Sequence, residues 1–293
     1  MPWRKKNACF FKKEYLEIMT DILLSTYNGA NYLSEQIDSI LYQTERDFRL
    51  LIRDDGSTDD TVERIDEYER RFPQRVCRLR DAMGNIGVIR SYERLLECSD
   101  ADYILFSDQD DVWLPEKVEL SLREIQKLEK MYGKGCPLLV HTDLQVVDEH
   151  LNLIDDSFWD YSAIDPYELD CNLKELGMSN SVTGCTMIIN RALRKKTLPF
   201  PKVVTMHDAW LSIVAGKYGK VIPLGVATIK YRQHIGNAVG ALRKETMSEK
   251  IRNLMSVIEA NRKRYAMTKG IIYHSVFDYM YYKIKDMRRR AKL

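Results

Sequence analysis

Short apolar runs alternate with amphipathic stretches from residue 22 to residue 106. The runs at residues 22–24, 48–52, 76–79 and 103–106 have the composition of buried strands. The stretches between them repeat apolar residues at the helical spacing of three or four. This alternation predicts an α/β fold with a mainly parallel sheet flanked by helices. Such sheets bind ligands at the carboxyl ends of their strands, so the turns after the first, second and fourth runs are expected to share one edge.

An acidic turn follows the fourth run. Asp108, Asp110 and Asp111 lie within four consecutive residues. Carboxylates held this close repel one another unless a cation lies among them. Oxygen ligands in this number suit a hard ion, so the turn predicts a site for Mg²⁺ or Mn²⁺. The alternative is an acidic helix start, because Pro115 follows and acids are favoured just before a helix.

Length and composition favour a globular body. The 293 residues, 45% of them hydrophobic, suffice for one large α/β domain with an appendage or for two small domains. The sequence has no uncharged apolar run of about 18 residues, so we expect no membrane-spanning helix. The six cysteines are scattered without a C-x-x-C pair, which indicates reduced thiols and a cytoplasmic protein.

Charge is distributed unevenly along the chain. The whole chain carries +2, but residues 241–293 contain 14 Lys and Arg against five Asp and Glu, which leaves the body acidic. We therefore expect three parts. They are an N-terminal extension at 1–19 without an assigned function, a catalytic domain at 20–240 and a basic helical tail at 241–293.

The tail has the pattern of an amphipathic helix. We expect it to lie on an anionic membrane surface, which would make the protein peripheral on the inner face of the cell membrane. Packing on the body or on a second subunit is the alternative. A nucleic-acid partner is not expected. The apolar stripe is Ile272, Val276, Met280 and Ile284, with Tyr273, Phe277 and Tyr281 beside it and Lys283, Lys285, Arg288, Arg289 and Arg290 at its end.

Six short motifs follow one another along the chain. They are Ser25-Thr26-Tyr27-Asn28-Gly29, Asp54-Asp55-Gly56-Ser57-Thr58-Asp59-Asp60-Thr61, Gly84-Asn85-Ile86-Gly87, Ser107-Asp108-Gln109-Asp110-Asp111, Met206-His207-Asp208-Ala209-Trp210 and Tyr231-Arg232-Gln233-His234-Ile235-Gly236-Asn237. Their order and spacing resemble the GT-A nucleotide-diphospho-sugar glycosyltransferases of family 2, over roughly residues 20–240. The last three motifs are most similar to the bacterial rhamnosyltransferase-like members.

The resemblance implies how a nucleotide sugar is held. In the family an aromatic residue of the first loop packs on a pyrimidine base and a carboxylate after the second strand accepts its N3–H, which here implies Tyr27 and Asp55. Turn chemistry is the alternative for Asp55. Arg90 resembles a basic contact to the nucleotide, with a solvated helix arginine as the alternative. The implied nucleotide-sugar site comprises Thr26, Tyr27, Asn28, Asp55, Arg90, Asp108 and Gln109.

The resemblance also implies a metal site and a catalytic base. Asp110 would bind Mg²⁺ or Mn²⁺, and His234 resembles a distal ligand of the metal or diphosphate, with a structural histidine as the alternative. Asp208 matches the general base of an inverting transfer. Family members more often carry glutamate where His207 stands, so its role is open, and a helix N-cap is the alternative for both residues. The residues expected at a sugar or acceptor pocket are Trp113, Gly184, His207 and Trp210, although tryptophans are more often core residues.

Together these features predict an inverting glycosyltransferase that acts in cell-surface polysaccharide synthesis. It would move a sugar, L-rhamnose, from dTDP-rhamnose to a saccharide or lipid-linked saccharide acceptor. The alternatives are a UDP-hexose-using enzyme of the same family and a catalytically silent nucleotide-sugar-binding module. A nucleotidyltransferase is disfavoured, because the loop after the first strand lacks the lysine that would bind a triphosphate.

Overall fold

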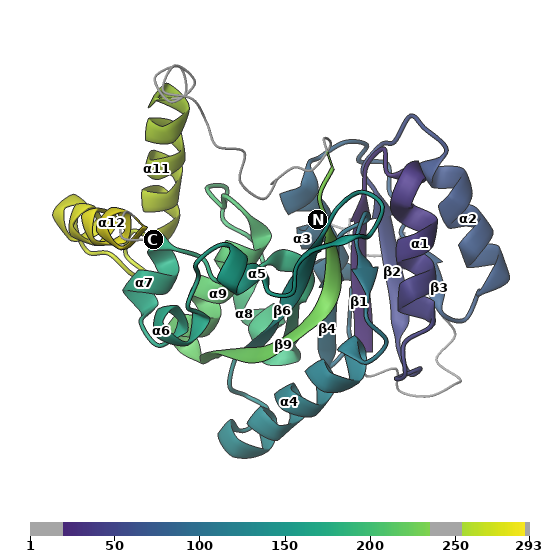
Figure 1. The fold of residues 1–293 in the computed structure, drawn as a ribbon, viewed down its shortest axis with the longest axis horizontal. Coiled ribbons are helices and arrows are strands. Elements are labelled where there is room, and N and C mark those ends of the chain that lie inside the picture. The colour runs from purple at the N-terminus through teal and green to yellow at the C-terminus, as the bar shows by residue number, and fades with distance from the viewer. Residues whose placement is uncertain (1–19, 235–253, 291–293) are drawn as a thin grey trace, which may run out of the picture.

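The computed structural model describes residues 20–234 and 254–290 (Figure 1). The strands are β1 (Thr20–Thr26), β2 (Arg49–Asp54), β3 (Val76–Arg78), β4 (Tyr103–Ser107), β5 (Val112–Trp113), β6 (Leu138–Val147), β7 (Leu153–Asp155), β8 (Met187–Asn190) and β9 (Lys220–Arg232). The helices are α1 (Ala30–Leu41), α2 (Thr61–Arg71), α3 (Val88–Cys98), α4 (Lys117–Tyr132), α5 (Phe158–Tyr161), α6 (Pro166–Asp170), α7 (Leu173–Met178), the 3₁₀ turn η1 (Gly184–Thr186), α8 (Arg191–Thr197), α9 (His207–Tyr218), α11 (Leu254–Thr268) and α12 (Val276–Arg290).

The first four strands form the parallel half of the sheet. β1 lies between β2 and β4, and β3 pairs with the outer edge of β2, all in parallel register. The four apolar runs of the sequence fall on these strands, and helices α1, α2 and α3 connect them as predicted. The turns that follow β1, β2 and β4 therefore emerge at one edge of the sheet, as the alternation predicted.

The second half of the sheet changes direction. β8 is antiparallel to both of its neighbours, β4 and β6, while β6 and β9 run parallel to each other. The path across the sheet is β3-β2-β1-β4-β8-β6-β9-β5, with β7 paired to β6. The α/β class is confirmed, and the sheet is mixed rather than mainly parallel beyond β4.

Two apolar layers enclose the sheet because consecutive strand residues point to opposite faces. On β1, Leu23 belongs to the apolar cluster that includes residues of α3, α8 and α9, whereas Ile22 and Leu24 belong to the cluster that includes residues of α1, α2 and α4. All three side chains are fully buried, and burying one leucine or isoleucine stabilises the fold by about 1.5–3 kcal/mol. The strand that leads into the first of the turns at the sheet edge is thus anchored from both faces of the sheet.

Helices α11 and α12 pack on the body through α7 and lie far from α1 and α2 (Figure 1). Between the two helices, Tyr273 is fully buried and its hydroxyl donates to the Lys174 carbonyl at 2.6 Å. Ile272 is buried against Gly177, and the Lys174 ammonium lies 2.8 Å from the Asp278 carboxylate. Ile272 and Tyr273 were predicted in the apolar stripe of the tail helix, but they belong to the core of the body. For these two residues the alternative of packing on the body is correct. None of the helices in the described ranges combines the length and apolar character needed to cross a bilayer.

Candidate active site

The turns after β1 and β2 are joined by short hydrogen bonds. The Asn28 backbone N–H donates to Ser57 Oγ at 2.8 Å, and Asn28 Oδ1 accepts from the Thr58 N–H at 2.8 Å. The Asp55 N–H donates to the Thr26 carbonyl at 2.8 Å. Three of the residues expected at the nucleotide-sugar site, Thr26, Asn28 and Asp55, are therefore brought together at the sheet edge.

Gln109 joins the acidic turn to the first turn. Its Oε1 accepts from the Tyr27 N–H at 2.8 Å, and its Nε2 donates to the Tyr27 carbonyl at 3.1 Å. This contact needs glycine two residues after Tyr27, because a Cβ on Gly29 would lie 2.3 Å from Gln109 Oε1. With its backbone clamped, Tyr27 keeps 49% of its side chain exposed, which leaves the ring face open for stacking.

Asp55 is buried beneath the third glycine-containing turn. One oxygen accepts from the Ile86 N–H and from Arg53 Nη1, and the other accepts from the Gly87 N–H. The Arg53 guanidinium continues to Asp81, 3.1 Å away. Asp55 thus fastens the turn at residues 84–87 to β2, and Arg53 is a member of this region that the motifs did not indicate.

Arg90 lies at the start of α3 and contacts a different part of the chain. Its guanidinium pairs with Glu93 and donates to the carbonyls of Phe200 and Pro201. These contacts attach α3 to the segment before α9. The structure does not bring Arg90 to the first two turns by any described hydrogen bond.

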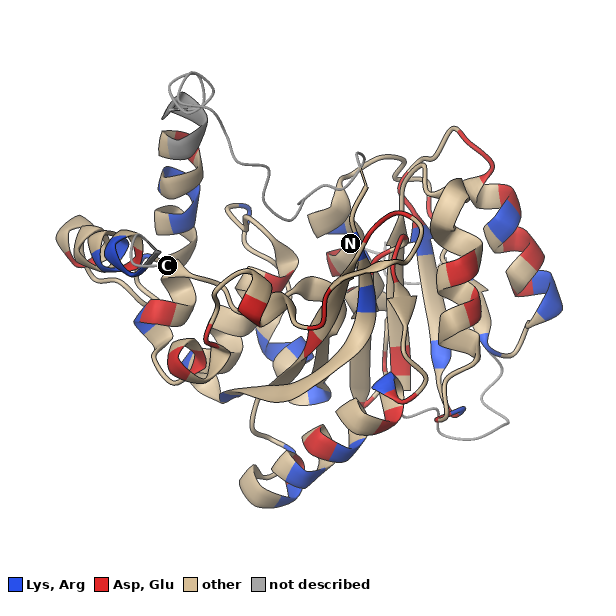
Figure 2. Ribbon diagram, in the orientation of Figure 1, with Lys and Arg blue, Asp and Glu red and all other residues tan. Residues whose placement is uncertain are grey.

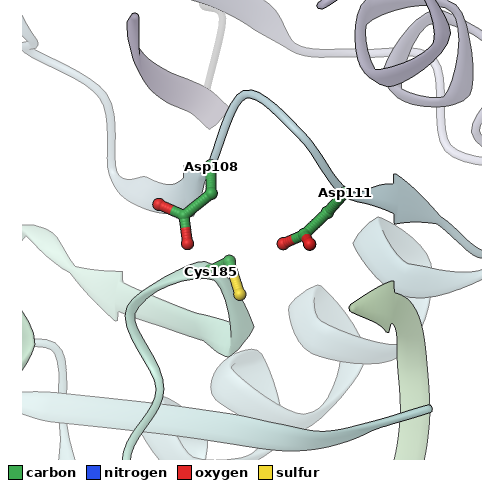
Figure 3. A group of neighbouring side chains, drawn as sticks. All are labelled: Asp108, Asp111 and Cys185. Carbon is green, nitrogen blue, oxygen red and sulfur yellow. The ribbon is translucent and has the colours of Figure 1, made fainter. Parts of the chain in front are cut away.

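Two acids of the acidic turn, Asp108 and the buried Asp111, face the buried thiol of Cys185 in η1 (Figure 3). One ligand atom from each of Asp108, Asp111 and Cys185 lies within 4.8 Å of the others. Desolvation, with the charge of Asp110 second, raises the pKa of Asp108 to about 7. The same two causes raise the pKa of Asp111 well above its usual value, and Asp111 Oδ2 has no hydrogen-bond partner among the described residues.

Lys117 lies beneath this cluster in the core. It is fully buried over the ring of Trp113, 4.8 Å from the ring centroid, and desolvation lowers its pKa to about 8. The charge of Asp111 acts in the opposite direction and offsets part of this lowering of the lysine pKa. Trp113 itself is a buried core residue. The structure therefore supports the core alternative for Trp113 and not the expected position in a sugar pocket.

Asp110 and His234 meet across the sheet edge. His234 Nε2 lies 2.9 Å from Asp110 Oδ2, and the imidazole packs at 4.7 Å on the ring of Tyr32. The two residues are 124 positions apart in the chain, so only the folded sheet can join them. Asp and Glu positions, red in Figure 2, also gather in the turns at this edge.

Arg232 holds the acidic turn from the end of β9. Its Nε donates to the Asp110 carbonyl at 2.8 Å, and its backbone N–H donates to Asp111 Oδ1 at 3.1 Å. The guanidinium also pairs with Glu35 and lies 4.8 Å above the ring of Tyr32. Arg232 stands two residues before His234, so it positions both halves of the Asp110–His234 contact.

The residues of the acidic turn fit a divalent cation. Asp110 and His234 supply one carboxylate oxygen and one imidazole nitrogen close enough to share an ion, and Asp108 lies beside them. These ligand types suit Mn²⁺, and Mg²⁺ when water and phosphate oxygens complete its shell. The unpartnered oxygen of Asp111 and the raised pKa values show that ionisation of these carboxyl groups is unfavourable without a compensating positive charge, which a cation would supply.

Asp208 lies in the first turn of α9, where the helix dipole favours a negative charge. Desolvation raises its pKa to about 6, and its Oδ1 accepts from the Ala209 N–H at 2.6 Å. Asn180 bonds to the carboxyl group, and the charge of Arg264 on α11 acts in the opposite direction to desolvation. The tail therefore reaches the surroundings of Asp208, which the sequence did not indicate.

His207 is buried beside Asp208 but points into the core. Its ring stacks on Tyr92 at 4.1 Å, and burial lowers its pKa to about 3, so the imidazole is neutral. Neither ring nitrogen has a hydrogen-bond partner among the described residues. A Cβ on Gly184 would lie 2.7 Å from His207 Nε2, so the close approach that Gly184 permits here is that of the imidazole.

Trp210 is also a core residue. It is 7% exposed, and its indole N–H donates to the Thr197 carbonyl at 3.1 Å. The N-cap alternative for the start of α9 does not hold, because Met206 is the capping residue and makes no side-chain capping bond. Asp208 thus differs from His207 and Trp210, whose rings pack in the core.

The chain belongs to glycosyl transferase family 2, whose family model matches residues 21–194. It is 35% identical over 99 residues to the dTDP-rhamnosyl transferase RfbG of Shigella flexneri, covering 33% of this chain and 34% of RfbG. It is 26% identical over 222 residues to Escherichia coli WfgD, described as a UDP-Glc:alpha-D-GlcNAc-diphosphoundecaprenol beta-1,3-glucosyltransferase, covering 74% of this chain and 78% of WfgD. The chain spans only part of several curated relatives, including 58% and 59% of two uncharacterised Rickettsia glycosyltransferases.

Solved structures confirm the GT-A fold. Staphylococcus aureus TarS 1–349 in complex with UDP-GlcNAc matches with a TM-score of 0.61 and 16% identity, covering 94% of this chain and 73% of that one. Mannosyltransferase PcManGT from Pyrobaculum calidifontis, in complex with GDP-Man and Mn²⁺, matches with a TM-score of 0.59 and 14% identity over 94% of this chain and 73% of the other. At these identities the likeness concerns the fold alone.

We predict that Arg232→Met weakens Mn²⁺ binding by about 10–100-fold, because residues that orient metal ligands typically contribute that much to affinity. Isothermal titration with Mn²⁺ measures the effect directly. Arg80→Met, which removes an arginine from a surface ion pair with Glu69, is the matched control and should bind Mn²⁺ like the wild type. Unchanged Mn²⁺ affinity in a folded Arg232→Met protein would reduce Arg232 to a structural role.

Proposed function

We propose that this chain is an inverting glycosyltransferase that moves L-rhamnose from dTDP-rhamnose to a saccharide or lipid-linked saccharide in cell-surface polysaccharide synthesis. The observation that carries the proposal is the meeting of Asp110 with His234 at the edge that also holds Tyr27 and Asp55. Family membership supports the reaction class.

The two relatives RfbG and WfgD are named for different donor sugars, and each name suggests a donor for this chain. RfbG is named a dTDP-rhamnosyl transferase and WfgD a UDP-glucose-using enzyme, and both resemble this chain. Thymine and uracil present the same N3–H edge, so Tyr27 stacking and a carboxylate acceptor serve either base. A UDP-hexose donor is therefore the alternative within the same proposal.

The diphosphate is proposed to lie over the acidic turn. Asp108, Asp110 and His234 would hold Mg²⁺ or Mn²⁺ there, and the bound ion would neutralise charge on the departing nucleoside diphosphate. PcManGT was solved with GDP-Man and Mn²⁺, which supports a cation in this fold. Arg232 keeps the Asp110 backbone in place while the ligand binds.

Asp208 is proposed as the general base. The acceptor hydroxyl oxygen forms a bond to the anomeric carbon, the bond from that carbon to the diphosphate oxygen breaks, and the hydroxyl proton passes to the Asp208 carboxylate. A pKa of about 6 leaves Asp208 ionised at neutral pH yet basic enough to accept the proton. Asn180 bonds to the carboxyl group and orients it. The neutral ring of His207 stacks on Tyr92 and thereby attaches the start of α9 to α3.

The acceptor and the location are proposed together. A lipid-linked acceptor would be met in the cytoplasm at the inner face of the cell membrane. WfgD, which is named for a diphosphoundecaprenol-linked acceptor, supports that class of substrate. A free saccharide is the other acceptor consistent with the same chemistry.

We predict that dTDP-rhamnose with Mn²⁺ raises the melting temperature more than UDP-glucose or GDP-mannose does. A donor at about 100 times its Kd adds about 2.7 kcal/mol to the free energy of unfolding, which differential scanning fluorimetry detects. A larger shift with UDP-glucose would select the UDP-hexose alternative. No shift with any of the three nucleotide sugars would contradict the proposed donor site.

We predict that Asp208→Asn lowers acceptor-dependent turnover by about 10²–10⁴-fold with little change in donor affinity, since the base acts on the acceptor. In the wild type, kcat/KM should fall as the pH drops through about 6, because protonated Asp208 cannot accept a proton. That acidic limb should vanish in the variant's residual activity.

The matched control is Asp21→Asn, which makes the same chemical change in a buried ion pair with Arg49, at the opposite end of β1 from the site. It should alter stability without the loss of turnover. Near-normal turnover of Asp208→Asn would remove this residue from the chemistry, and lost donor binding would give it a structural role. Donor binding without any turnover in the wild type would favour the catalytically silent module.

A further inference from the structure

Helix α12 has one face that the body does not cover. The inner face packs on the body through Tyr279 and Asp286, which are 4% and 3% exposed. The outer face carries six large apolar side chains, each at least 46% exposed and with Phe277 at 87%. These six residues, named here the outer stripe, are Val276, Phe277, Met280, Tyr281, Ile284 and Met287.

The outer stripe is continuous along the helix. Its members recur at intervals of one, three and four residues, which at about 100° per residue places them in a single sector of roughly 140°. The 15-residue helix is about 22 Å long, so the stripe is a long, narrow apolar surface. Isolated exposed apolar residues are common in proteins, but a contiguous stripe marks an interaction surface.

The charges of α12 are sorted between its two faces. Asp278 pairs with Lys174 of the body, and Asp286 contacts Ser179 and Arg289 on the inner side. Arg288 is exposed within the sector of the outer stripe, and Lys285 borders it with half of its side chain exposed although it pairs with Glu175. Figure 2 shows Lys and Arg along α11 and α12. The uncovered face is therefore apolar and positive.

We propose that the outer stripe of α12 docks on an anionic lipid bilayer. Apolar side chains inserted at the headgroup boundary and cations at the phosphate level are the two attractions that hold an amphipathic helix in this position. A second copy of the chain fits less well. A two-fold interface would bury Arg288 of each copy against an outer stripe whose six residues include no acid to pair with it.

The location of α12 gives this docking a consequence for the proposed transfer reaction, although docking itself does not depend on that reaction. α12 is attached to the body through the buried side chains of Tyr273 and Tyr279, and α11 carries Arg264 into the surroundings of Asp208. A docked α12 would hold the acceptor side of the site at a fixed distance from the membrane, where a lipid-linked acceptor is presented.

Vesicle co-sedimentation of the full chain tests the proposal without any activity measurement. Vesicles of phosphatidylcholine with about one third phosphatidylglycerol should retain the protein at least tenfold better than pure phosphatidylcholine, and salt of about 0.5 M should reduce retention. Phe277→Ser with Tyr281→Ser should lower retention at least tenfold. Arg288→Gln should lower it less and should weaken the dependence on salt.

The matched control is Tyr42→Ser with Met131→Ser, which removes two side chains that are 73% and 63% exposed outside α12. It should bind vesicles like the wild type, and all variants should keep the wild-type melting temperature because the replaced side chains are exposed. Equal retention of the Phe277/Tyr281 variant, or no retention of the wild type, would overturn the proposal. A wild-type dimer in sedimentation velocity that this variant abolishes, without vesicle binding, would instead make the stripe a subunit interface.

Discussion

The desolvation and mutual repulsion of carboxylates held in one turn form the constraint on which the site depends. Asp108 and Asp111 both have raised pKa values because they are desolvated and lie near Asp110. A turn that crowds charge in this way is unfavourable by itself, so strong attachments must hold it. The sheet supplies them through β4 on one side and through the Arg232 side chain and backbone on the other. A ligand that brings positive charge would relieve the repulsion, which links stability to ligand binding.

The same constraint explains why the site needs both halves of the sheet. The parallel half places three turns at one edge and joins them through Asn28 and Gln109. The second half brings β9 across the sheet, so that Arg232 and His234 reach the acidic turn from more than 120 residues away. A domain that ended just after the acidic turn would contain the acids without the groups of β9 that position them.

Sequence patterns predicted the first half of the fold well because each strand there is a short apolar run next to an amphipathic helix. They also placed Tyr27, Asp55, Asp110 and Asp208 near strand or helix ends, where the structure has them. They could not show that Arg53 fastens Asp55, that Gly184 makes room for His207, or that Arg264 approaches Asp208, since each contact joins distant segments. In the tail, helical periodicity alone could not separate buried Ile272 from exposed Val276. That division arises only when α12 packs on α7.

The central claim is that Asp110 and His234 complete a cation-dependent donor site, and donor binding measured with and without metal tests it most directly. Isothermal titration with dTDP or UDP should show binding in the presence of Mn²⁺, little binding with excess chelator, and weak binding for Asp110→Asn even with Mn²⁺ present. The Asp110→Asn protein should keep its fold, because the side chain is only partly buried. Equal nucleotide affinity with Mn²⁺ and with chelator, or unchanged affinity in Asp110→Asn, would contradict the account.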